Sequence, residues 1–343
     1  MHIPKVLYHW RCSKFSVASN PDAKPYTAES GIKAVNEHLR RCGLNGYAES
    51  SSVHPNVYRL HYEIKGNPLI SIIIPNKDHI VDLSRCIDSI LQKSTYLNYE
   101  IIIVENNSTQ KETFEYYEKI QKKDNIQVKV YETHGEFNYS AINNFGVKYA
   151  KGEHILLLNN DIEIISNSWL EEMLMFSQRE DVGAVGAKLY YPNNTIQHAG
   201  VILGIGGVAG HSHKYFDRSA TGYMSRCFIQ QDLSAVTAAC LMMKKSVFEQ
   251  VNGLDEENFK VAFNDVDLCM KIRKAGYLIV WTPYAEAYHY ESISRGTEDT
   301  PEKQARFKGE AEAFMIKWKK ELELGDPYYN QNLTLEREDF SIN

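Results

Sequence analysis

The sequence predicts an α/β fold, a Rossmann-like and mostly parallel sheet flanked by helices. Short apolar runs alternate with amphipathic helical patterns, and polar residues follow most of the runs. Alternation of this kind implies right-handed crossovers between parallel strands. The expected strands of this region are 69–74, 100–104, 126–131 and 155–158. The last has four consecutive apolar residues, which is typical of a strand buried on both faces.

Length and composition describe an ordinary globular protein. The chain has 343 residues, a formal net charge of -6, 24% charged and 43% apolar residues. These values allow about two domains and give no reason to expect a nucleic-acid partner. The six cysteines show no CxxC pair or other metal spacing, so we expect buried thiols in a reducing compartment. No segment resembles a signal peptide or reaches the roughly 18 apolar residues of a membrane span, which predicts a cytoplasmic protein.

Residues 1–66 are expected to form an N-terminal appendage. A helical stripe ends at Gly43, and alternating apolar residues predict a half-buried strand over 58–64. A compact aromatic segment lies at 7–11. This region has little core of its own, so we expect its apolar residues to dock on the rest of the chain.

Polar side chains gather after three of the expected strands. They are Pro75-Asn76-Lys77-Asp78, Glu105-Asn106-Asn107 and Asn159-Asn160-Asp161. Open α/β sheets bind ligands outside the carboxyl ends of their strands, and a carboxylate such as Asp161 suits a divalent cation that also binds substrate phosphates. A polar turn that caps the next helix explains the triplet 159–161 equally well. The glycine-rich phosphate signatures GxGxxG and GxxxxGK[ST] do not occur, so metal-held phosphate is the simpler design.

The pattern is less regular after Ser166. It predicts a helix over 169–176, a strand over 182–190, a small apolar run over 235–243 and a helix through Val247 and Val251. A glycine-rich stretch, 200–210, leads to His211 and His213. An H-x-H pair could bind a metal, but no carboxylate is near it in the sequence. Such a pair more often belongs to a mobile loop or to a wall facing an acceptor, and we favour the loop.

Three features are expected in the last part of the chain. A helix begins with Asn264 or Asp265 as N-cap and ends at Gly276. A strand over 277–281 ends where Pro283 turns the chain, and a polar loop follows. A helix with an apolar stripe over 307–322 has a basic face, for which packing on the domain is favoured over membrane-surface binding. The polar and aromatic tail from 326 is expected to run along the surface.

Several motifs occur together in one order. They are Pro75-Asn76 after a strand, Val104-Glu105-Asn106-Asn107-Ser108, Asn143-Asn144-Phe145-Gly146, Leu158-Asn159-Asn160-Asp161, Phe263-Asn264-Asp265-Val266-Asp267 and His289-Tyr290-Glu291-Ser292. This set resembles family 2 glycosyltransferases, which have the GT-A fold. The similarity covers about residues 69–320. It is most apparent with bacterial O-antigen, capsule and rhamnan glycosyltransferases.

The resemblance implies a role for each motif. Asp161, the last residue of a D-x-D-like triplet, and His289 would bind Mn2+ or Mg2+. Asp265 would be the general base of an inverting transfer. Pro75 and Glu105 would hold the nucleotide base, and Asn160 would lie near the ribose. The full set predicted to bind the nucleotide sugar is Pro75, Asn76, Glu105, Asn107, Asn143, Asn160 and Arg295. Asn143 stands where relatives have an arginine near the diphosphate. Arg295 is included because it follows His289 closely in the sequence, on a loop expected to close over the donor.

The resemblance also implies an organisation and partners. A GT-A domain over 67–325, with a nucleotide-binding half (67–163) and an acceptor half (164–325), would be followed by a tail, 326–343. The donor would be a UDP- or dTDP-linked sugar, and the acceptor a growing surface glycan on a lipid carrier at the inner face of the plasma membrane, where peripheral association is expected. The segment 7–11 is similar to a connector in larger members, so the chain is expected to be one module of a multi-domain glycosyltransferase.

Two other functions stay open at this point. A sugar nucleotidyltransferase would also use a nucleotide site at the sheet edge, although the missing glycine-rich loop argues against it. A non-catalytic carbohydrate-binding module on a decayed transferase fold would explain the triplet Asn-Asn-Asp, although Asp265 and His289 are both retained. Pyrophosphate formation from a nucleoside triphosphate and a sugar phosphate would identify the first. Absence of donor hydrolysis with Mn2+ would favour the second.

Overall fold

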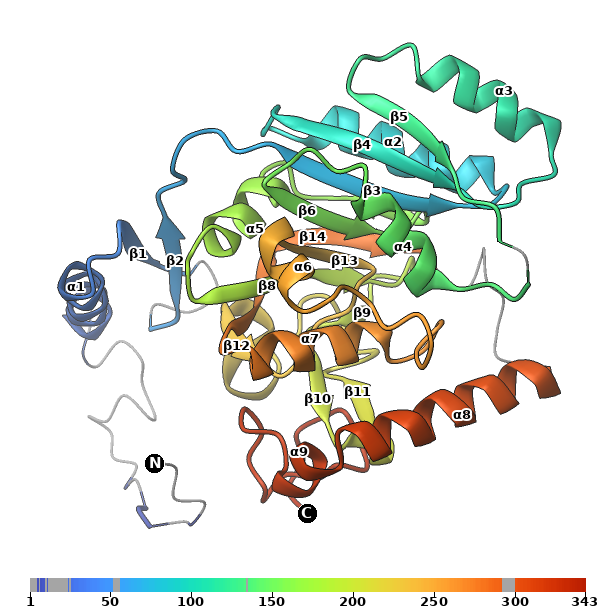
Figure 1. Ribbon diagram of the computed structural model, residues 1–343. Helices are drawn as coiled ribbons and strands as arrows, with labels where there is room; N and C mark the ends of the chain where they lie inside the picture. The colour runs from blue at the N-terminus through green and yellow to red at the C-terminus, as the bar shows by residue number, and fades with distance from the viewer. Residues whose placement is uncertain are drawn as a thin grey trace.

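A computed structural model describes residues 5, 7–9, 11, 24, 26–51, 56–133, 135–291 and 300–343 (Figure 1). The helices of this part are α1 (Tyr26–Arg41), α2 (Ile80–Lys93), α3 (Lys111–Ile120), α4 (Tyr139–Val147), α5 (Trp169–Ser177), α6 (Lys245–Gln250), α7 (Asn264–Lys274), α8 (Pro301–Lys317), α9 (Lys319–Leu324) and the short 3-10 helices η2 (Ile205–Gly207) and η3 (Tyr223–Phe228). The strands are β1 (Gly46–Ser50), β2 (Tyr58–Tyr62), β3 (Ile70–Asn76), β4 (Tyr99–Glu105), β5 (Ile126–Val130), β6 (His154–Leu158), β7 (Ile162–Ile164), β8 (Val182–Tyr190), β9 (Ile196–His198), β10 (Val201–Leu203), β11 (Ala209–His211), β12 (Gln231–Leu233), β13 (Cys240–Lys244) and β14 (Leu278–His289).

Strands β3, β4, β5 and β6 are parallel and form one side of a ten-stranded sheet within the described residues. Their order is β6-β3-β4-β5, so the chain runs outward from β3 to β5 and then returns to the far side of β3. This reversal makes a topological switch point between β3 and β6, where open α/β sheets bind ligands. The four strands predicted for this region are confirmed, and helices lie between them as the alternating pattern predicts, although β3 continues through Pro75 to Asn76.

The other side of the sheet is mixed. β13 is antiparallel to β6 and β8, whereas β14 is parallel to β8. β14 runs through Pro283, so the prediction that this strand ends there is wrong. Its pairing with β8 is irregular between Trp281 and Glu286, and such an interruption accommodates a residue that has no N–H to donate. The carboxyl end of β14 pairs with β7.

Helices cover both faces of the sheet, with an apolar core on each side (Figure 1). α2, α3 and α5 pack on one face, and α4, α6 and α7 pack on the other. Because successive strand residues point to opposite faces, Ile72 and Ile74 lie in one core and Ile73 in the other. This explains why the central strands are continuous apolar runs.

The N-terminal region docks through β2, as expected. Arg59 forms an ion pair with the buried Glu172 of α5, and the ring of Tyr62 lies edge-on to Phe176 at 5.4 Å. The backbone N–H of Lys65 donates to Gln178 at 2.9 Å. The expected helix and strand correspond to α1 and β2. Part of the aromatic segment 7–11 lies outside the described residues.

The C-terminal segment differs from its prediction. The expected helix is interrupted at Trp318, which separates α8 from α9. The tail does not simply follow the surface, because Leu333 and Phe340 are buried with Ile202 and Ile205 in a small core beneath the β10–β11 hairpin. Asp326 accepts a hydrogen bond from the backbone N–H of Leu203 at 2.8 Å. Among the described residues, every helix is too short or too polar to traverse a lipid bilayer.

Candidate active site

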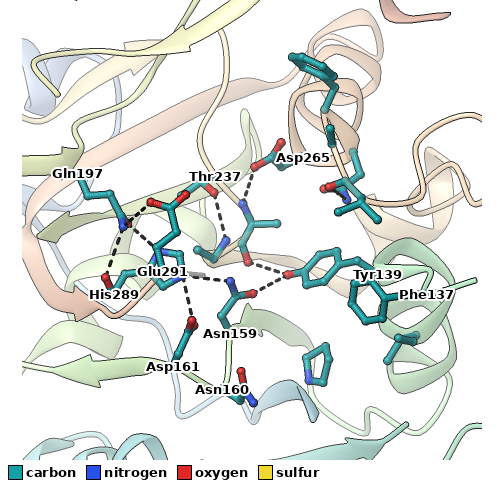
Figure 2. Close-up of a pocket in the computed structure, with 18 of the residues that line it drawn as sticks. Phe137, Tyr139, Asn159, Asn160, Asp161, Gln197, Thr237, Asp265, His289 and Glu291 are labelled. Carbon is teal, nitrogen blue, oxygen red and sulfur yellow. Dashed lines mark hydrogen bonds and ion pairs between the residues drawn. The ribbon is translucent and has the colours of Figure 1, made fainter. Parts of the chain in front are cut away.

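A cavity of about 480 Å³ opens at the switch point between β3 and β6 (Figure 2). Residues from both sides of the sheet line it. Six of the ten residues predicted for the site are brought together here: Pro75, Asn76, Asn160, Asp161, Asp265 and His289. The strand ends therefore converge as an open α/β sheet requires.

Two asparagines join the ends of β3 and β6. The Asn160 side-chain amide donates to the Asn76 carbonyl oxygen at 2.7 Å, and both residues are buried. The Asn76 amide donates in turn to the Tyr117 hydroxyl at 2.7 Å. These bonds fix the polar floor of the cavity without using a charged group.

Strand pairing brings Asp161 and His289 together from positions far apart in the sequence. β7 begins directly after Asp161, and its antiparallel partner β14 ends at His289, which lies opposite Ile162. The backbone N–H of Tyr290 donates to the Asp161 carbonyl oxygen at 3.0 Å. As a result, His289 Nε2 lies 3.2 Å from Asp161 Oδ1, and both side chains are buried.

Neighbouring amides fix the proton position of His289. Gln197 Nε2 donates to Glu291 at 3.2 Å and to the His289 carbonyl oxygen at 3.4 Å, so its Oε1 faces His289 Nδ1, 2.6 Å away. Nδ1 therefore carries the hydrogen. Nε2 keeps its lone pair, which accepts from the Asn159 amide at 3.2 Å. Figure 2 shows this network around His289.

This donor set fits a divalent cation. A carboxylate oxygen and an imidazole lone pair face one another at 3.2 Å, and adjacent ligands of an octahedral ion with bond lengths of about 2.1 Å lie about 3 Å apart. The hydrogen bond from Nδ1 to Gln197 is the kind of support that ligating histidines receive. The described residues contain no cluster of three or more His, Cys, Asp or Glu side chains suited to a metal. Two protein ligands leave the other coordination positions of an octahedral ion for phosphate oxygens and water, as is usual for Mg2+.

Asp265 lies in the first turn of α7 and faces the same cavity. Its Oδ2 accepts from the backbone N–H of Ala238 at 3.1 Å and its Oδ1 from that of Val266 at 2.8 Å. The prediction that Asn264 or Asp265 is the N-cap is wrong: the N-cap is Phe263, with φ 58 and no side-chain cap. A bulky residue in this left-handed region is uncommon and indicates local strain beside the cavity.

Glu105 and Asn107 do not line the main cavity. They line a second, smaller pocket beside β5. The Tyr117 hydroxyl donates to Glu105 at 2.6 Å and also accepts from Asn76, so Glu105 is linked to the main cavity through one tyrosine. The Asn107 amide donates to the Thr133 carbonyl oxygen at 2.9 Å.

Of the two remaining predicted residues, Asn143 does not line the cavity. Asn143 is fully buried in α4, where its amide donates to the Tyr139 carbonyl oxygen at 2.9 Å. Tyr139 and Ile142 of the same helix line the cavity instead. Arg295 lies outside the described residues, which stop at 291 and resume at 300. Their roles in binding stay predictions.

The prediction of a loop is wrong for the glycine-rich stretch. It forms the β10–β11 hairpin around η2. The H-x-H pair does not act as a unit: His213 is buried and stacks on Phe340 at 4.5 Å, whereas His211 lines the cavity with its Nδ1 3.0 Å from Nδ1 of His198. The two histidines therefore have separate surroundings.

Sequence reasoning missed several polar residues of the cavity. The Tyr139 hydroxyl donates to Asn159 at 3.0 Å and to the Ala238 carbonyl oxygen at 3.2 Å. Gln197 and His198 are buried polar residues in a short strand. Such residues between apolar neighbours, as in Ile196-Gln197-His198, are the one signal that the sequence offers.

Comparison with known proteins identifies relatives of the whole chain. An uncharacterized protein of Sinorhizobium fredii, y4gI, is 48% identical over 99% of this chain and 37% of its own length. The O-antigen biosynthesis protein RfbC of Myxococcus xanthus is 39% identical over 99% of this chain and 26% of its own length. The chain thus spans about a third of these relatives or less.

A solved structure has a similar fold. The mannosyltransferase PcManGT of Pyrobaculum calidifontis, in complex with GDP-Man and Mn2+, superposes with a TM-score of 0.54 at 13% identity and covers 90% of this chain and 80% of that one. At this identity the likeness shows the fold alone, which is GT-A. The model of the family described as "Glycosyl transferase family 2" matches residues 71–251, more than half of the chain. The chain therefore belongs to glycosyl transferase family 2.

Proposed function

We propose that the protein is an inverting glycosyltransferase that moves a sugar from a UDP- or dTDP-linked donor to a hydroxyl group of a growing bacterial surface polysaccharide. One observation carries the proposal: Asp161, His289 and Asp265 line one cavity although they come from three distant segments. Figure 2 draws Asp265 apart from the Asp161–His289 pair. Attack by a hydroxyl needs a base, and departure of a diphosphate needs positive charge. These residues supply the groups for both.

Asp265 is the proposed general base. It takes the proton of the acceptor hydroxyl while that oxygen forms a bond to the anomeric carbon, on the face opposite the leaving group. The bond from this carbon to the diphosphate oxygen breaks, and the nucleoside diphosphate leaves with the electron pair. The N–H groups of Ala238 and Val266 hold the carboxylate in a fixed orientation for this proton transfer.

Asp161 and His289 are the proposed ligands of Mn2+ or Mg2+. When bound, the ion would act as a Lewis acid that neutralises the charge of the departing diphosphate. Gln197 keeps the His289 ring in the orientation and tautomer that ligation requires. The Asn159 amide, which donates to Nε2 in this structure, would give up that bond to the ion.

The other predicted residues are proposed to bind the nucleotide sugar. Pro75 and Glu105 would hold the base, and Asn160 would lie near the ribose, supported by Asn76. Asn107 belongs to the same nucleotide-binding edge. Asn143 and Arg295 are assigned to the diphosphate region. For Glu105, the link through Tyr117 to Asn76 supports a share in shaping this part of the cavity.

The proposal extends to organisation and place of action. Residues 67–163 would be the nucleotide-binding half of the GT-A domain and 164–325 the acceptor half. The name of the relative RfbC, an O-antigen biosynthesis protein, supports a surface glycan as acceptor. We propose that this glycan is lipid-linked, that the protein meets it at the cytoplasmic face of the membrane, and that the chain acts as one module of a larger glycosyltransferase.

The substitution Asp265→Asn tests the proposal. Asparagine preserves the size of the side chain and an oxygen for the Ala238 N–H, but it cannot take up a proton. Transfer or Mn2+-dependent donor hydrolysis is expected to fall about 10²- to 10⁴-fold, while calorimetry gives an unchanged affinity for the donor. Glu257→Gln, on an exposed turn, is the control. Full turnover by Asp265→Asn would remove this residue from the mechanism.

A further inference from the structure

Two histidines beside the cavity have no part in the mechanism above. His198, at the end of β9, is fully buried, and His211, in β11, is half-buried and lines the cavity. Their Nδ1 atoms are 3.0 Å apart. A hydrogen bond between two such atoms requires that one carries the hydrogen and the other offers its lone pair.

A backbone group determines which histidine donates. The N–H of Thr237 lies 3.4 Å from His198 Nε2, and a backbone N–H can only donate. His198 Nε2 therefore has the lone pair and His198 Nδ1 carries the hydrogen, which it donates to His211 Nδ1. The hydrogen of neutral His211 must then be on Nε2.

The same backbone segment holds the proposed base. Thr237 donates to His198, and the next residue, Ala238, donates to Asp265 Oδ2 at 3.1 Å. His211 is thus fixed relative to Asp265 through two consecutive N–H groups. Burial lowers the pKa of His211, which favours the neutral ring. His211, Asp265, Glu291 and His289 line the same cavity. His211 is therefore a neutral hydrogen-bond donor in the cavity that also holds the proposed base and the proposed metal ligands.

We propose that His211 donates its Nε2 hydrogen to a hydroxyl oxygen of the sugar part of the nucleotide sugar. This inference rests on the proposed function, in which the transferred sugar lies between the general base Asp265 and the diphosphate. A neutral imidazole suits a hydroxyl group, whereas a diphosphate attracts cations. His211 is thus a specificity-determining residue, and His198 is the positioning residue that sets its tautomer.

Three variants of His211 distinguish the contribution of Nε2 to sugar binding from that of Nδ1. Glutamine places an amide donor near the position of Nε2, asparagine places its amide near Nδ1, and phenylalanine keeps the ring without either group. We expect His211→Phe and His211→Asn to lower nucleotide-sugar affinity about threefold to tenfold, the effect of one neutral hydrogen bond. His211→Gln should restore most of it. UDP and dTDP carry no sugar on the diphosphate. Their affinities should therefore be the same in the wild-type protein and the three variants.

The probes are UDP-galactose, UDP-N-acetylglucosamine and dTDP-rhamnose, with UDP and dTDP as controls, each measured by calorimetry with Mn2+. If the wild-type protein binds a nucleotide sugar and His211→Phe binds it equally well, the inference is wrong and the proposed function stands. If the wild-type protein binds none of the five compounds, the proposed function is wrong and the inference fails with it.

The tautomers provide a test that needs no ligand and no variant. Long-range 1H–15N correlation spectra of the wild-type protein should give His211 as the Nε2–H form and His198 as the Nδ1–H form. The opposite assignment for His211 would direct a lone pair into the cavity and would overturn the inference even if the variants did not fold.

Discussion

The two aspartates of the motif 263–267 lie two residues apart and have opposite surroundings. Asp265 is half-buried at the cavity, whereas Asp267 is fully buried beneath the C-terminal helices. Asp267 accepts from the Trp318 indole N–H at 2.8 Å and forms an ion pair with Lys317 at 2.8 Å. One carboxylate is available for chemistry, and the other attaches α7 to the end of α8.

This difference predicts that alanine destabilises the protein much more at position 267 than at position 265. Asp267→Ala should lower the free energy of unfolding by about 3 kcal/mol, because it leaves buried polar partners without their acceptor. Asp265→Ala should lower it by less than about 1 kcal/mol, because its oxygens border an open cavity. Urea denaturation of the two variants measures both values. Equal losses would contradict the assignment of Asp267 as a structural residue.

The Asp161–His289 pair predicts metal-dependent binding. In Asp161→Ala and His289→Ala, calorimetry should give an affinity for UDP or dTDP with Mn2+ that is at least about tenfold lower than in the wild-type protein. Without Mn2+, the three proteins should bind equally, because the lost contact is to the ion. His38→Ala, on the exposed face of α1, is the control. Unchanged affinity in both variants with Mn2+ would argue against this metal site.

At the residue scale, sequence identified the side chains that follow strands but not those that support them. Asp161 and Asn160 follow an apolar run, so their place at the sheet edge was predictable. Gln197 orients a ring that lies 92 positions away in the chain, and nothing in its own neighbourhood in the sequence indicates this. Pairs of this kind depend on strand pairing, which local patterns do not specify.

At the scale of elements, α8 holds the segment that precedes α7. The buried Glu310 accepts hydrogen bonds from the backbone N–H groups of Lys260 at 3.1 Å, Val261 at 3.2 Å and Ala262 at 2.5 Å. Val261 and Ala262 line the cavity. One carboxylate therefore fixes the wall from which Asp265 projects.

Replacing this carboxylate should affect stability and transfer together. Glu310→Gln retains one acceptor oxygen for three donors, so the free energy of unfolding should fall by about 1–3 kcal/mol. Transfer should also fall, since Asp265 loses support. Glu312→Gln, an exposed residue of the same helix, is the matched control for both measurements. A stable and fully active Glu310→Gln variant would show that the wall needs no such anchor.

The elements that sequence misjudged share a physical cause. Pro283 reads as a strand end, yet it lies where the pairing of β14 is irregular. The glycine-rich stretch reads as a loop, yet its hairpin packs against the tail through Ile202 and Ile205. In both cases contacts between distant segments override local propensity, whereas the strands β3 to β6 were predictable because burial on both faces makes their apolar runs continuous.

At the scale of the whole molecule, buried neutral histidines make stability depend on pH. Burial lowers the pKa of His154 and of His213 to about 4 from 6.5. Below pH 6.5 the unfolded chain takes up protons at these positions and the folded protein does not, so the unfolded state gains stability. The free energy of unfolding should therefore fall as the pH drops from about 6.5 to about 4.

Urea denaturation between about pH 7 and pH 5 measures this dependence. His154→Asn is the matched variant, because asparagine keeps a polar group near the Ser177 hydroxyl, which lies 2.9 Å from His154 Nδ1, but does not titrate. Its stability should vary less steeply with pH than that of the wild-type protein. Identical slopes would mean that His154 contributes no proton uptake on unfolding.

The packing of the tail has a practical consequence for anyone who divides a longer polypeptide of this kind. The backbone N–H of His213 donates to the Glu338 carbonyl oxygen at 2.8 Å, and that of Gly206 to Leu335 at 3.2 Å. Because the tail from 326 is largely polar, its hydropathy gives no sign that truncation after Gly325 would remove buried contacts. Truncation would uncover the underside of the hairpin that carries His211, so the truncated product would be expected to precipitate and to select its sugar poorly.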